Sequence, residues 1–257
     1  MMMRLFLLVI TFLACSAALR AQVVNIENRR MHTDSVRRAG SLSLGLSFTE
    51  NNGKQLFVTR NALALQSKSK SLRDIWLVLA NLDLSKADGA AFSNSAFLHL
   101  RYNRKMSGLL RWEAFTQAQY NRVLGIGSRW LAGTGPRLKL FSTEKSALYW
   151  GNLYMFEYEA TTANLPVISR QHRLSAYLSA TFDLSPALPG ELITTTYYQP
   201  RLDRLADYRL SHETSLELNI TKKLRATTRL YYFYDAVPPS GIAGRALAVE
   251  QGFRVGF

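Results

Sequence analysis

Cysteine is almost absent from the sequence: Cys15 is the only one in 257 residues. It lies within residues 1–21, which have the form of a signal peptide, with Arg4 ahead of an apolar run and small residues leading to Ala21. Cleavage after Ala21 would leave no thiol, which excludes disulfides, a cysteine nucleophile and a zinc–cysteine site. The residues before Cys15 loosely resemble a lipoprotein signal, so lipoprotein processing is the alternative. Both readings predict an exported protein.

Long hydrophobic runs are also missing after residue 21. None approaches the roughly 20 apolar residues that a membrane-spanning helix requires. Hydrophobic residues nevertheless make up 47% of the sequence, which is enough for one large core or one closed barrel. If the chain crosses a membrane, it must therefore do so with strands.

Acidic residues are scarce, with 18 Asp and Glu against 32 Lys and Arg, a net charge of +14. Removing Arg4 and Arg20 with the signal peptide leaves +12. No helix-turn-helix, zinc finger or RNA-binding sheet motif accompanies this charge, so nucleic acid is not a predicted partner. Phosphate-bearing lipids or anionic solutes fit it better. The sequence also has no glycine-rich phosphate loop and no metal-binding histidine spacing, and we expect no cofactor and no metal.

A period of two dominates the chain after a polar N-terminal arm over residues 22–39. Between Tyr208 and Ile220, apolar and polar residues alternate at nearly every position, and the same holds over 41–48 and 224–234. A strand separates such residues onto two faces, whereas a helix would mix them. Residues 40–257 are therefore predicted to form an all-β domain.

Twelve strands are expected in this domain. The third is ambiguous, because apolar residues occupy both of its faces between Ile75 and Leu79. Turn residues such as Asn51-Asn52-Gly53 separate the strands, and connections after odd-numbered strands are the longer ones, as in the outer loops of bacterial barrels. The predicted strands cover 41–50, 54–67, 72–84, 91–103, 109–121, 126–141, 146–159, 171–183, 190–200, 207–221, 223–235 and 246–257.

Alternation alone fits either a soluble barrel or a membrane barrel. Three features favour the membrane: ionised residues recur on the polar face, aromatic residues stand near strand ends, and the last strand alternates through Phe253 and Val255 to Phe257. That last strand resembles the signal read by the barrel-assembly machinery, and it must pair with the first strand to leave no open edge in lipid. We therefore predict a transmembrane antiparallel up-and-down β-barrel in the outer membrane.

Several stretches resemble an uncharacterised family of outer-membrane proteins, the domain of unknown function 481 family, some of whose members are described as salt-stress-induced. The resemblance covers most of the chain and is densest from Asn94 to Glu159. It implies an outer-membrane barrel without an established activity, so no catalytic residues carry over. The matching stretches are Val24 to Arg30, Phe97 to Asn103, Glu113 to Asn121, Arg129 to Arg137 and Tyr154 to Glu159.

Charged residues predicted to face the lumen are the first candidate site. Over strands four to twelve they comprise ten bases and eight acids, an excess of only two, which indicates ion pairs that partly occlude a narrow lumen. Glu157 and Glu159 lie on one face and could instead bind a cation, but pairing with arginine is favoured. The predicted lumen charge network comprises Arg101, Arg111, Glu113, Arg129, Arg137, Glu157, Glu159, Arg173, Arg209, Glu213, Arg229, Glu250 and Arg254.

A second candidate site consists of arginines in the predicted outer connections, where the phosphates of lipopolysaccharide would be available. Solvated loop charge is an equally good reading. These residues are Arg122, Arg170, Arg201, Arg204 and Arg245.

Histidines are few, and only His99 is predicted to face the lumen, beside Arg101 and Glu113. A polar lumen network explains His99 better than a catalytic base does. The sequence therefore predicts a non-enzymatic envelope protein that is structural or permeable to small solutes. The alternatives are an outer-membrane lipid-modifying hydrolase and a soluble periplasmic ligand-binding barrel. The solute, the oligomeric state and the physiological role do not follow from the sequence.

Overall fold

The computed structural model describes residues 36–51, 54–87, 90–122, 125–162, 167–238 and 244–256. The predicted signal peptide, residues 22–35 of the predicted arm and Phe257 lie outside the described residues. Within these ranges no helix has the length and apolarity needed to cross a membrane.

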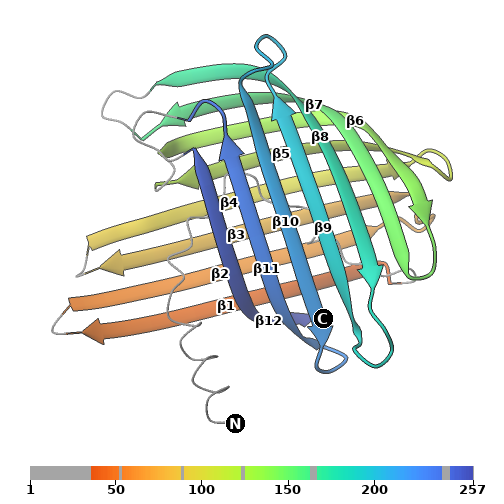
Figure 1. Ribbon diagram of the computed structural model, residues 1–257, viewed down its shortest axis with the longest axis horizontal. Helices are drawn as coiled ribbons and strands as arrows, with labels where there is room; N and C mark the ends of the chain where they lie inside the picture. The colour runs from red at the N-terminus through yellow and green to blue at the C-terminus, as the bar shows by residue number, and fades with distance from the viewer. Residues whose placement is uncertain are drawn as a thin grey trace.

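Twelve antiparallel strands follow one another around a closed barrel, and each pairs with its neighbours in sequence (Figure 1). The predicted all-β up-and-down barrel is confirmed. The strands are β1 (Arg38–Asn51), β2 (Lys54–Lys68), β3 (Asp74–Ala87), β4 (Ala90–Lys105), β5 (Leu110–Asn121), β6 (Ile126–Ser142), β7 (Ser146–Thr161), β8 (Ile168–Asp183), β9 (Gly190–Pro200), β10 (Tyr208–Asn219), β11 (Leu224–Asp235) and β12 (Arg245–Gly256).

Connections of two kinds form the two rims of the barrel. Connections that follow odd-numbered strands lie together at what we call the loop rim, which the sequence predicts to be the outer one. Connections that follow even-numbered strands form the turn rim, together with the start of β1 and the end of β12. The β9–β10 connection, residues 201–207, belongs to the loop rim, and the β10–β11 connection, residues 220–223, belongs to the turn rim.

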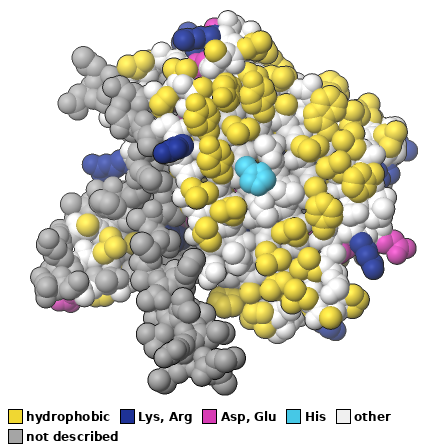
Figure 2. Space-filling model, in the orientation of Figure 1, with side chains coloured by type: hydrophobic (Ala, Val, Ile, Leu, Met, Phe, Trp, Pro, Cys, Tyr) yellow, Lys and Arg dark blue, Asp and Glu magenta, His cyan; other side chains and the backbone are white. Residues whose placement is uncertain are grey.

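The outer surface is apolar and the inner surface is charged. Leu44, Leu98 and Trp130 point outward and are exposed, whereas Arg101, Arg129 and Glu157 on the opposite strand faces are buried inside. Hydrophobic side chains cover the face shown in Figure 2, and most of the charged side chains visible there lie toward its edges. A soluble barrel would have the reverse arrangement, so the soluble-barrel alternative does not fit the structure.

Aromatic side chains face outward near both rims. Near the loop rim the rings of Tyr198, Tyr208 and Tyr234 contact one another in series, at centroid distances of 5.5 and 5.7 Å. Near the turn rim Trp76 and Tyr102 contact each other at 4.6 Å. Rings with an apolar body and a polar tip favour the two membrane interfaces, so this arrangement fits a chain that spans a bilayer.

Two histidines face outward, and both are hydrogen-bonded to side chains on the same surface. His172 Nδ1 contacts the Tyr154 hydroxyl at 2.5 Å. His212 lies between two threonine hydroxyls, with Nδ1 2.9 Å from Thr196 and Nε2 3.0 Å from Thr214. Since lipid offers no hydrogen bonds, such internal pairing is what keeps a polar ring stable on this surface.

The β1–β12 contact closes the barrel over a short distance. Ser41 pairs with Gly256 and Leu42 with Val255, near the turn rim. By contrast, β1 and β2 pair along their whole length. Phe253 and Val255 of the predicted barrel-closing strand point outward and are exposed. The predicted pairing of the last strand with the first is thus present, through Val255 and Gly256.

Two glycines make room for inward aromatic rings. The ring of Phe115 lies on Gly133, and the ring of Tyr177 lies on Gly151, so that a Cβ at either glycine would overlap with the ring. Tyr177, Leu153 and Tyr197 form a buried apolar cluster, against which Phe115 packs. These rings fill the middle of the barrel on the β5–β9 side.

Replacing Gly151 by alanine is therefore expected to lower the free energy of unfolding by about 1–3 kcal/mol, because the new methyl group displaces the Tyr177 ring. Urea unfolding of the protein folded in lipid vesicles measures the change. Gly108→Ala is the control, since nothing lies within 4 Å of a Cβ at Gly108. Equal stability of the two variants would contradict the close packing of Tyr177.

Candidate functional site in the barrel interior

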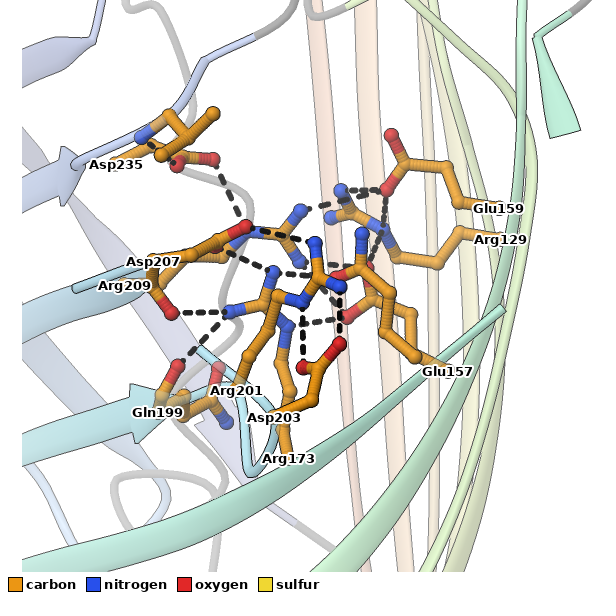
Figure 3. Close-up of polar contacts among 12 residues, drawn as sticks. Arg129, Glu157, Glu159, Arg173, Gln199, Arg201, Asp203, Asp207, Arg209 and Asp235 are labelled. Carbon is orange, nitrogen blue, oxygen red and sulfur yellow. Dashed lines mark hydrogen bonds and ion pairs between the residues drawn. The ribbon is translucent and has the colours of Figure 1, made fainter. Parts of the chain in front are cut away.

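Buried ion pairs link the strands inside the barrel, and the largest group surrounds Glu157 on β7. Arg209 Nη1 lies 2.8 Å from Glu157 Oε2, and Arg173 Nε lies 3.5 Å from the same oxygen. Arg129 Nε lies 4.0 Å from Glu157 Oε1 and donates to Glu159 at 2.6 Å. Figure 3 shows these side chains converging from different strands. We call these five residues the Glu157 cluster.

Arg209 belongs to β10 and Glu157 to β7, so their bond joins strands that are not neighbours. The same guanidinium lies 3.6 Å from Glu159 and donates from Nε to Asp235 at 3.0 Å. Arg209 therefore crosses part of the lumen and meets three carboxylates. Burying a charged arginine costs free energy unless acidic groups pair with it, and the three carboxylates provide this pairing for Arg209.

The β9–β10 connection extends the Glu157 cluster to the loop rim. Asp207 is buried and accepts a hydrogen bond from Arg173 Nη2 at 3.0 Å and from Arg201 Nη1 at 3.1 Å. Arg201 also donates to Asp203 through Nε at 3.0 Å and Nη2 at 2.6 Å (Figure 3). These hydrogen bonds lower the pKa of the exposed Asp203 carboxyl, so the pair stays ionised at neutral pH. The connection is thus tied to the interior of the barrel.

A second group surrounds Glu113 on β5. Its Oε2 accepts from Arg101 Nη1 at 3.0 Å and from the Tyr177 hydroxyl at 2.7 Å, and its Oε1 accepts from Asn103 at 2.5 Å. Arg137 Nη1 lies 3.7 Å from Oε1. Tyr177 belongs to β8, three strands away, so this bond also crosses the lumen. The Arg209–Glu157 and Tyr177–Glu113 hydrogen bonds therefore both place large side chains in the lumen beside β5 to β10.

A third group lies near the turn rim around Glu217 on β10. Arg254 Nη1 is 2.6 Å from Oε1, and Arg225 Nη1 is 3.2 Å from Oε2 and 2.6 Å from Glu191. Arg225 and Arg254 are directly opposite each other across β11 and β12, so the acids offset a like-charge pair.

The wall formed by β12, β1 and β2 differs from the rest of the interior. Most residues of its inward register are serine, glycine and alanine, and Gly45, Ser47 and Gly252 are exposed there. The same register also holds Arg60 opposite Gly45, and Glu250 and Arg254 on β12. We call it the small-residue wall. It comprises Ser41, Ser43, Gly45, Ser47, Ala62, Ala64, Ala246, Ala248 and Gly252.

The structure places the residues predicted for the lumen on the inner surface. Arg129, Glu157, Glu159, Arg173 and Arg209 come together in one cluster, and Arg101, Glu113 and Arg137 come together in another. Arg229 is directly opposite Glu250 across β11 and β12, and Glu213 is buried on β10 opposite Tyr231. Arg111 is opposite Arg137 on the neighbouring strand, and Arg254 joins Glu217.

Sequence reasoning missed three residues of the interior. Tyr177 was not a candidate because an inward tyrosine has no marker in a period-two pattern. Asp207 lies in a connection, and the residues around it in the sequence do not indicate that its side chain points inward to Arg173. Lys105 lay beyond the predicted end of its strand at residue 103, whereas β4 continues to Lys105.

His99 is buried among polar and aromatic groups on the inner surface. Its Nδ1 lies 3.1 Å from Gln117 Oε1, Arg101 Nε donates to Nε2 at 3.4 Å, and its ring stacks on Phe115 at 5.4 Å. Glu157 and Glu159, the alternative cation site, are engaged by arginines. No group of three or more metal-binding side chains is found in the part of the chain that the structure describes. The interior therefore has the chemistry of an ion-pair network.

The five arginines predicted for the outer connections all lie at or beside the loop rim. Arg122, Arg170, Arg204 and Arg245 are exposed. Arg201 differs, because its guanidinium is held by Asp203 and Asp207.

Comparison with protein-family profiles identifies the family of this chain. The profile of the family described as "Protein of unknown function, DUF481" matches residues 43–244, most of the barrel. The chain belongs to the DUF481 family. Comparison with curated proteins gives no match for this DUF481 protein.

The similar solved structures include outer-membrane β-barrel proteins. The translocator domain of the autotransporter NalP from Neisseria meningitidis has a TM-score of 0.51 and 13% identity, covering 90% of this chain and 91% of that one. The NanC porin has a TM-score of 0.45 and 11% identity, covering 86% and 98%. An outer membrane channel from Pseudomonas putida F1 has a TM-score of 0.45 and 11% identity, covering 88% and 97%. At such identities the likeness concerns the fold alone.

Proposed function

We propose that this DUF481 protein is a non-catalytic outer-membrane barrel that passes ions and small solutes through a narrow conduit. The observation that carries the proposal is the unequal filling of the lumen. Large side chains that cross the lumen, such as Arg209 and Tyr177, fill the space beside β5 to β10. The small-residue wall opposite them leaves its glycines and serines exposed. The conduit therefore runs along β12, β1 and β2.

The number of strands fits a conduit of this kind. About 8 strands enclose an interior that side chains fill, and 16–18 strands leave a wide aqueous channel. Twelve strands lie between these limits. The side chains in the interior then decide how much of the cross-section stays open, and here the ion pairs reduce it.

Planar-bilayer recording of the purified protein tests the proposal. We expect single-channel conductance well below that of an open 16-stranded porin, because the crossing pairs occupy part of the lumen. A wide channel with strong anion selectivity would contradict the occlusion, and the absence of any conductance would contradict the conduit.

The exposed arginines of the loop rim support a second part of the proposal, contact with lipopolysaccharide phosphates. Arg170 and Arg204 are exposed and lie at the rim predicted to be outermost. Arginine binds phosphate through paired N–H groups, and several such contacts around a rim would hold the surrounding lipid. The exposed outward face of β12, with Phe253 and Val255, likewise supports recognition by the barrel-assembly machinery.

Reversing both charges, Arg170→Glu with Arg204→Glu, is expected to weaken binding of lipopolysaccharide to the folded barrel by about tenfold or more, since each charge-assisted contact contributes about 1.5–3 kcal/mol. Co-purification of labelled lipopolysaccharide measures this. The control is Lys145→Glu with Lys222→Glu, which reverses two exposed charges at the turn rim. Unchanged binding by the Arg170/Arg204 variant would contradict the contact.

A further inference from the structure

Positive charges gather on the inner surface of β4, β5 and β6 near the turn rim. Lys105, Arg111 and Arg137 are directly opposite one another across these three strands, and Lys139 follows two residues after Arg137 in the same inward register. We call these four residues the basic wall. Lys105 is exposed, and Arg111 and Lys139 are partly exposed, so solvent at the turn rim reaches the basic wall.

Like charges directly opposite each other destabilise a sheet. Elsewhere in the interior many directly opposite pairs are complementary, as in Arg129 with Glu159 and Arg209 with Asp235. Rows of like charge also occur near the turn rim, where Asp183, Glu191 and Glu217 lie opposite one another across β8 to β10, and Arg225 and Arg254 pair with Glu191 and Glu217 there. In the basic wall Glu113 pairs with Arg137, but three cations in a row still carry a cost to folding that a ligand of opposite charge would reduce.

Among the described residues of β4 to β6, Glu113 is the one acid in the inward register. Its carboxylate forms ion pairs with Arg101 and Arg137 and accepts hydrogen bonds from Asn103 and Tyr177, so both of its oxygens already have partners. With Arg101 included, five bases face one acid, which leaves an excess of four positive charges on this part of the wall.

The flanking strands add no acid at this level. On β3 the inward residues are Ile75 and Leu77, and on β7 they are Tyr149 and Gly151. The Tyr149 ring lies under the Arg137 guanidinium, 3.9 Å from its centroid to Cζ, and so fixes that cation against the wall. In the described part of the chain neither Lys105 nor Lys139 has an acidic partner, which leaves both ammonium groups available to a ligand.

We propose that the basic wall binds a small oxyanion, with phosphate as the model chemistry, at the turn-rim mouth of the lumen. Lys105 and Lys139 supply charge-assisted donors of the kind that a phosphate needs, and Arg111 and Arg137 lie beside them in the same inward register. The inward orientation favours a free solute over a lipid headgroup, because the outer surface of the same strands faces the bilayer. This inference rests on the proposed conduit for its biological use, but the site itself can be tested without conductance.

Isothermal titration of the folded full-length protein in detergent with inorganic phosphate tests the site. We expect the wild-type protein to bind phosphate, and the Lys105→Gln with Lys139→Gln variant to bind it about tenfold more weakly or worse, since each charge-assisted hydrogen bond contributes on the order of tenfold in affinity. The control is Lys222→Gln with Lys223→Gln, which removes two exposed lysines at the same rim, and it should bind as the wild type does.

Stability provides the second measurement. Removing Lys105 and Lys139 relieves like-charge repulsion, so the urea midpoint of this variant without phosphate should equal or exceed that of the wild type. Absence of phosphate binding by the wild type, unaltered binding by the variant, or a lower midpoint would each overturn the proposal. A protein that binds phosphate without conducting would refute the conduit and leave the oxyanion site standing.

Discussion

Replacing Glu157 by glutamine is expected to lower the free energy of unfolding by about 3–5 kcal/mol, the usual cost of removing one partner from a buried ion pair. Glu157 and three arginines, Arg129, Arg173 and Arg209, are all buried. Removing its charge takes one acidic partner away from each of these three cations. Because all of them are buried, water does not replace the lost carboxylate. Glutamine keeps the shape of the side chain, so the loss reports the charge and not a cavity.

Urea unfolding in lipid vesicles measures this loss, with Glu144→Gln as the control, because Glu144 is exposed in the β6–β7 turn. The loss in the double variant Glu157→Gln with Arg173→Gln should be smaller than the sum of the two single losses, since the Glu157–Arg173 pair can be lost only once. Wild-type stability of Glu157→Gln would show that the Glu157 cluster does not hold the barrel together.

Replacing Ser43 by tryptophan is expected to reduce single-channel conductance severalfold. Ser43 lies on the small-residue wall, opposite Ala62, where the proposed conduit runs. An indole there would project from a wall of small side chains into the proposed conduit and reduce its cross-section, because the crossing residues already occupy the opposite side of the lumen.

Leu44→Trp is the matched control, since Leu44 is the next residue on the same strand and points outward, where it is exposed. A tryptophan facing lipid should leave conductance unchanged. Equal conductance of the Ser43 and Leu44 variants would mean that ions pass elsewhere or not at all, and would contradict the position of the conduit.

The order and extent of the strands followed from the sequence because alternation is a local property. Most strand boundaries agree with the structure to within two residues, and β9 agrees at both ends. The third strand could not be oriented from its sequence, since both of its faces are apolar. Leu77 and Leu79 prove to face the lumen, where they pack with Ala64 and Phe97. The identity of these neighbours depends on strand pairing, which a single strand does not contain.

The candidate site was predictable only as a set of inward charges. The near balance of acids and bases indicated pairing, and the structure contains many such pairs. Which acid meets which base was not predictable, because Arg209 reaches Glu157 across the lumen and Asp207 turns inward from a connection. The overall balance also concealed the local excess at the basic wall, since Lys105 lies past the predicted end of its strand and acids elsewhere cancel it in the total.

The sequence by itself determined that this chain forms twelve amphipathic strands with charges on one face and apolar groups on the other, since the period of a strand fixes which face each residue takes. The tertiary structure alone decided how the charges are distributed in space. Closure of the barrel brings β7 within reach of β10 and β5 within reach of β8, fills that side of the lumen and leaves the wall of β12, β1 and β2 lined by small residues. Distances across a closed barrel depend on the curvature and register of all twelve strands, and no local pattern encodes them.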